Sequence, residues 1–225
     1  MSWLSRGWLL VGAISCAAAQ SGKELTDSPE SVSRITVLVY NYAGISVEAV
    51  TEAERAAGRI FESAGIETDW LSCPLYPEQA NDHPACLVTP GPANLILRIA
   101  AGSMAQRLLP DQESFGVALQ PEDGSFGTIA NIFSDRAREL VNRRGIAFSV
   151  MLGHLMAHEL GHLLLGTGAH SSVGIMHVPW HNKELDLLSR GLMAFMPFEA
   201  ERMRTSVRAR VAAQRALEAA IVPGS

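Results

Sequence analysis

Two histidines and a glutamate lie close together in the stretch His158-Glu159-Leu160-Gly161-His162. On a helix, residues four apart lie on the same face one turn from each other, so both imidazoles can bind one metal ion. Glu159, between them, can reach a zinc-bound water and act as its general base. The pattern therefore predicts a zinc site that activates water for hydrolysis.

A third zinc ligand is expected downstream, because catalytic zinc has three protein ligands and one open position. His170 follows the glycine turn at Gly166 and is the first candidate. Gly166 can end the helix, and Gly168 gives the loop the freedom to bring His170 back to the pair. His177 is the second candidate for this position, and His181 and His154 are further alternatives.

The segment from Ala157 to Trp180 resembles the metzincin zinc peptidases, whose pattern is HExxHxxGxxH followed by a methionine turn. The residues His170-Ser171-Ser172 and Gly174-Ile175-Met176 are most similar to matrix-metalloprotease (matrixin) domains. One residue is added on each side of the glycine here, which gives HExxHxxxGxxxH. The resemblance implies that His158, His162 and His170 bind zinc, that Glu159 is the base, and that Met176 forms a hydrophobic floor below the histidines.

The motif and the resemblance together predict a zinc-dependent endopeptidase that acts on a protein or peptide substrate. Glu159 would take a proton from the zinc-activated water as it attacks a carbonyl, and pass it to the leaving amine. Two alternatives stay open: a non-catalytic zinc-binding module that recognises a partner, and a zinc hydrolase acting on non-peptide amides. Glu159 argues against the first, because a structural site needs no base and usually closes with a fourth protein ligand.

The elements that must position this site follow from hydrophobic periodicity. Apolar, often β-branched runs predict strands at 34–40, 67–71, 94–99, 116–120 and 127–133. Helical spacing predicts helices at 46–65, from a cap at Ser134 to the break at 143–145, and at 146–165, 183–188 and 197–221. This order predicts a mixed sheet. The metzincin resemblance implies an α+β zincin fold, with a mostly parallel twisted sheet, an active-site helix and a small C-terminal helical subdomain. It also makes 127–133 the expected edge strand that pairs with the substrate.

Length and charge restrict the class of protein. A chain of 225 residues with 48% hydrophobic content can bury the core of one domain. A net charge of −5 gives no general attraction to nucleic acid. We interpret the arginines near the C-terminus as the solvated face of a terminal helix: Arg202, Arg204, Arg208, Arg210 and Arg215.

The N-terminus has the pattern of an export signal. Arg6 precedes a short apolar run that ends in Ala17-Ala18-Ala19, a small-residue cleavage pattern. We therefore expect a signal peptide at 1–19, a flexible lead-in at 20–33 and one catalytic domain at 34–225. That domain would divide into an N-terminal subdomain at 34–166 and a C-terminal subdomain at 167–225.

The cysteines agree with export. Without the signal peptide, Cys73 and Cys86 are the remaining pair, and an even number of cysteines in an exported protein favours a disulfide. We expect a monomer that is secreted or periplasmic. It would attach to a membrane only if Cys16 were lipidated, and the leucine usual three places before such a cysteine is missing.

Overall fold

The computed structural model describes residues 33–87, 90–101, 103–104 and 114–221, all within one compact unit, Val32–Ser225. The expected signal peptide, Cys16 and all but the last residue of the lead-in lie outside the described residues. None of the helices in the described ranges has the length and apolar character needed to cross a membrane.

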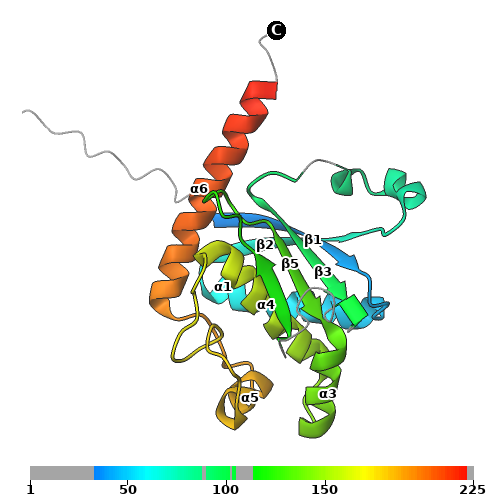
Figure 1. Cartoon of the computed structure of the whole chain (residues 1–225), viewed down its shortest axis with the longest axis vertical. Coiled ribbons are helices and arrows are strands. Elements are labelled where there is room, and N and C mark those ends of the chain that lie inside the picture. The colour runs from blue at the N-terminus through cyan, green and yellow to red at the C-terminus, as the bar shows by residue number, and fades with distance from the viewer. Residues whose placement is uncertain (1–32, 88–89, 102, 105–113, 222–225) are drawn as a thin grey trace, which may run out of the picture. The chain divides into compact units, whose positions relative to one another are not determined.

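Five strands of the described chain form one sheet in the order β2-β1-β3-β5-β4 (Figure 1). Neighbouring strands among β1, β2, β3 and β5 run parallel, and β4 runs antiparallel to β5. The mixed, mostly parallel sheet expected from the sequence is confirmed. The strands are β1 (Ser33–Asn41), β2 (Ile66–Cys73), β3 (Asn94–Ala100), β4 (Gly116–Leu119) and β5 (Ile129–Phe133).

The strand β5 is not an edge strand, so the prediction for 127–133 is wrong. It pairs with β3 on one side and with β4 on the other. Four of its five residues are buried, as expected for a strand covered on both faces. The outer strand at this end of the sheet is β4. Hydrophobic periodicity is the same for an inner and an outer strand, so the sequence could not separate them.

Five α-helices accompany the sheet in the described residues: α1 (Val47–Ser63), α3 (Ser134–Arg144), α4 (Phe148–Leu165), α5 (Asn182–Ser189) and α6 (Pro197–Ile221). The first begins at a cap, where Ser46 Oγ accepts from the backbone N–H of Ala49. In contrast, Ser134 does not cap α3 as expected. The cap residue is Phe133, and Ser134 Oγ donates instead to the backbone oxygen of Ala100.

The helix α4 is apolar on nearly every side and packs closely against α1 (Figure 1). Gly153 permits this contact, because an added Cβ there would lie 2.6 Å from the backbone oxygen of Ala53. The sequence 158–162 is therefore held inside the core on a rigid helix, and not on a surface loop.

Two further features connect distant segments. A disulfide joins Cys73 at the end of β2 to Cys86, the pairing expected from the sequence. Arg210 in α6 is 1% exposed, so its assignment to a solvated helix face is wrong. Its guanidinium donates to the backbone oxygens of Pro92, Gly127 and Leu163, and these bonds compensate for its burial.

Candidate metal centre

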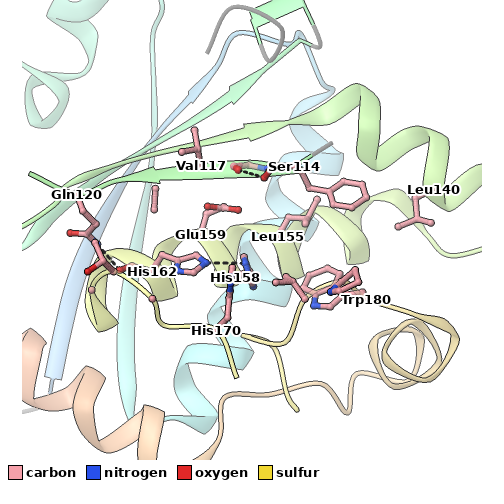
Figure 2. A pocket seen from close by; sticks show the side chains of 18 residues that line it. Ser114, Val117, Gln120, Leu140, Leu155, His158, Glu159, His162, His170 and Trp180 are labelled. Carbon is pink, nitrogen blue, oxygen red and sulfur yellow. Dashed lines mark hydrogen bonds between the residues drawn. The ribbon is translucent and has the colours of Figure 1, made fainter. Parts of the chain in front are cut away.

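Three imidazoles converge at the C-terminal half of α4 (Figure 2). His158 and His162 lie one helical turn apart, with 3.1 Å between their Nε2 atoms. The loop after Gly166 brings His170 back, so that its ring centroid is 4.8 Å from that of His162 and 5.7 Å from that of His158. One nitrogen from each of the three rings lies within 4.8 Å of the others. This is a group that could hold a metal ion.

The alternative third ligands have other places in the structure. His177 donates from Nδ1 to the backbone oxygen of Ser171. His181 caps α5, and His154 donates from Nδ1 to the backbone oxygen of Val150 on its own helix. None of these three belongs to the histidine group found in the described part of the chain.

Backbone contacts set the orientation of His158 and bring the segment 174–176 against α4. His158 Nδ1 donates to the backbone oxygen of Ile175, 2.8 Å away, which fixes the tautomer and leaves Nε2 free to bind a metal. The next residue, Met176, is fully buried. An added Cβ on Gly161 would lie 2.8 Å from Met176 Sδ, so the methionine packs directly against α4 beside the histidine pair.

Burial prepares the imidazoles to be ligands. It lowers the pKa of His158 to about 4, and together with the neighbouring histidines it lowers the pKa of His162 to about 3. Both rings are therefore neutral near pH 7, and a neutral imidazole is the form that binds a metal. Two neutral imidazoles on the apolar helix α4, with a third imidazole from the loop beside them, are a donor set that suits zinc.

Glu159 lies on the side of the histidines that faces β4, towards the strand that carries Val117 (Figure 2). It is 4% exposed, and burial raises its pKa to about 8. Gly116 makes this position possible, because an added Cβ there would lie 2.6 Å from Glu159 Oε1 and 2.6 Å from the backbone oxygen of Asn131. The sequence analysis missed Gly116; a glycine within a strand is the one signal that could have indicated such a close approach.

A cavity of about 720 Å³ opens beside the histidines and Glu159. Residues from β4 and the segment before it, including Phe115 and Val117, form one wall. The other wall comes from Val178, Pro179 and Trp180. The Trp180 ring contacts the His158 ring edge-on, with 5.7 Å between the centroids. A mostly apolar cavity beside a few polar groups is the usual form of a ligand site.

Comparison with known proteins gives a distant structural likeness. No known protein family matches the chain by its sequence model, and no curated protein matches its sequence. Among solved structures, an archaemetzincin from Methanopyrus kandleri is 17% identical, with a TM-score of 0.46, over 80% of this chain and 98% of that one. A zinc-dependent peptidase from Methanocorpusculum labreanum is 13% identical, with a TM-score of 0.44, over 74% of this chain and 99% of that one. At these values the function must be argued from the site itself.

Proposed function

We propose that the protein is a zinc-dependent endopeptidase of the metzincin type, similar in its motif to matrixins. The observation that carries the proposal is the convergence of His158, His162 and His170 beside the buried carboxylate of Glu159, at the wall of an open cavity. The three histidines would hold the zinc. When bound, zinc supplies a Lewis acid that polarises a carbonyl and lowers the pKa of water.

Glu159 is the general base in this proposal. Burial raises the pKa of Glu159 to about 8 in the metal-free protein, and the positive charge of a bound zinc would lower it towards the range in which a carboxylate accepts and returns a proton near neutral pH. Its place against Gly116 keeps it between β4 and the histidines. Glu159 would take a proton from the attacking water and give it to the departing amine.

The substrate would lie along β4. In the described chain β4 has one neighbouring strand, β5, so its outer backbone groups are available to an extended peptide. Such a peptide gains main-chain hydrogen bonds by extending the sheet. The cavity walls at Phe115, Val117 and Trp180 would then accept an apolar side chain of the substrate. This strand edge favours peptides over small non-peptide amides.

The number of ligands favours an enzyme over a non-catalytic zinc module. A closed structural site needs four protein ligands. The described residues bring together three histidines, with no cysteine, aspartate or fourth histidine in the group. An open position and a neighbouring base are what catalysis requires.

The test combines metal content with peptide hydrolysis. The mature protein should contain one zinc per chain and cleave peptides, and Glu159→Gln should keep the zinc but lose most of the activity. Glu54→Gln is the matched control, because burial also raises the pKa of Glu54, which lies on α1 and outside this cavity. Full activity of Glu159→Gln would remove Glu159 from the mechanism, and wild-type protein free of metal would refute the zinc site.

We also propose that the protein is exported, with residues 1–19 removed. The disulfide between Cys73 and Cys86 supports this, because disulfides persist in oxidising compartments. Mass spectrometry of protein from the native host should find a chain that starts at Gln20. A chain that starts at Cys16 and carries a lipid would establish the lipoprotein alternative.

A further inference from the structure

The third ligand of the proposed zinc site has weaker support from its own element than the other two. His158 and His162 lie on α4, whereas His170 is exposed and lies in the irregular segment 166–181. A loop residue can bind a metal tightly only if neighbouring contacts keep it in place. The contacts of the next residue, Ser171, show what holds His170.

Ser171 is fixed by both its backbone and its side chain. Its N–H donates to the backbone oxygen of Met176 at 3.1 Å, and its oxygen accepts from His177 Nδ1, also at 3.1 Å. Its hydroxyl donates to Glu199 Oε1, on the first turn of α6. Ser171 therefore joins the loop of His170 to the methionine turn and to the C-terminal helix.

Glu199 is 1% exposed, and its carboxylate has two partners. Oε2 accepts from the backbone N–H of Met196 at 2.7 Å, which satisfies a free N–H at the start of α6. Oε1 accepts from Ser171. A buried carboxylate is costly unless its oxygens are hydrogen-bonded. The burial of Glu199 therefore requires both the bond from Met196 and the bond from Ser171. Capping α6 needs one oxygen; the other is committed to the loop.

We propose that Glu199, through the Ser171 hydroxyl, is a positioning residue for His170 and so for the zinc affinity of the site. This inference rests on the proposed function, because it assumes that His170 binds zinc. Ile175 orients His158 by a direct hydrogen bond to the ring, whereas Glu199 would act one step further out, by holding the loop residue next to His170. Removing an outer partner that orients a metal ligand typically lowers metal affinity about 10–100-fold.

The decisive experiment is a double-mutant cycle on full-length mature protein. Zinc dissociation constants are measured against a competing chelator, and the visible spectrum of the cobalt(II)-substituted protein reports the ligand geometry. Ser171→Ala should weaken zinc binding about 10–100-fold and alter the cobalt spectrum. Ser171→Thr should retain wild-type affinity, because it keeps the hydroxyl. Ser172→Ala, a change at the exposed neighbouring serine, is the matched control and should have no effect.

The same change is then made without the third ligand. In a His170→Ala background, Ser171→Ala should cause no further loss of zinc affinity, since the residue that it positions is gone. An equal loss in both backgrounds, or unchanged affinity of Ser171→Ala in the wild-type background, would overturn the inference. A wild-type protein that binds no zinc, or a His170→Ala variant with unchanged affinity, would overturn the proposed site itself and this inference with it. Glu199→Gln tests the same hydrogen bond from its acceptor side. If the Glu199→Gln variant does not fold, the Ser171 variants still test the inference.

Discussion

Gln120 Nε2 lies 2.6 Å from the backbone oxygen of His162 and donates a hydrogen bond to it. The same oxygen accepts from the backbone N–H of Gly166, the residue that ends α4, so the bond from Gln120 connects the residue after β4 to the last turn of α4. Two arginines of α6 do the same from the other side. Arg210 donates to the oxygen of Leu163, and Arg202 donates to that of Leu165. The end of the helix that carries the proposed zinc ligands is therefore held by both the strand β4 and the C-terminal helix.

Removing Arg210 should destabilise the protein strongly. Arg210→Ala would leave three backbone oxygens without this donor: those of Gly127 and Leu163, whose bonds to Arg210 are buried, and that of Pro92, whose bond is partly buried. We expect the free energy of unfolding to fall by about 3 kcal/mol or more, measured by urea denaturation. Arg208→Ala on the exposed face of α6 is the control and should change it by about 0.5 kcal/mol or less. Equal effects of the two variants would show that the buried contacts of Arg210 contribute little.

Gly116→Ala should reduce activity without removing zinc. The added methyl would lie 2.6 Å from Glu159 Oε1, so the carboxylate must move. Because a displacement of about 1 Å at a reacting group can cost about 100-fold in rate, we expect kcat to fall by about that factor. Elemental analysis should still find one zinc per chain.

Gly58→Ala is the matched control for this substitution. Its added Cβ would lie 3.5 Å or more from its neighbours, an ordinary contact distance, on the helix α1. Its activity should equal that of the wild type. If Gly116→Ala also kept wild-type kcat, Glu159 would tolerate displacement, and its proposed role as the base that takes a proton from the attacking water would be weakened.

Local patterns predicted the parts of the site that lie on one element. The spacing of His158 and His162 needs only the helical period, and the sheet follows from the order of strands and helices. No local pattern in the sequence indicates the contacts between distant segments. The approach of Gly116 to Glu159 depends on where β4 lies relative to α4, which periodicity does not set. Arg210 was misassigned for the same reason, because its three backbone acceptors come from distant parts of the chain.

His170→Ala should lose most of its zinc affinity, and His177→Ala should keep it. The ring of His170 faces those of His158 and His162, whereas His177 Nδ1 is bonded to the backbone of the loop. The measurement is zinc content after dialysis against a weak chelator, with His181→Ala, at the cap residue before α5, as a second control. Zinc loss from His177→Ala with retention by His170→Ala would move the third ligand to His177.

The stability of the metal-free protein should depend on pH through its buried site. Burial holds the pKa of His158 near 4 and of His162 near 3, below the ordinary value of 6.5. Their stabilising contribution is complete above pH 6.5 and is lost as the pH falls towards these values, because the unfolded chain then binds more protons. Burial raises the pKa of Glu159 from 4.5 to about 8, so its contribution is complete below pH 4.5 and is lost as the pH rises to 8.

Glu159→Gln isolates the second effect. The glutamine cannot ionise, so the variant should gain stability relative to the wild type between pH 4.5 and 8, by about 1.4 kcal/mol per pH unit. Urea denaturation of both chelator-treated proteins across this range gives the difference at each pH. The loss of stability at acid pH, which comes from the histidines, should be the same in both proteins. A difference that does not change with pH would mean that Glu159 is already ionised in the folded metal-free protein, because its carboxylate is reached by water in solution.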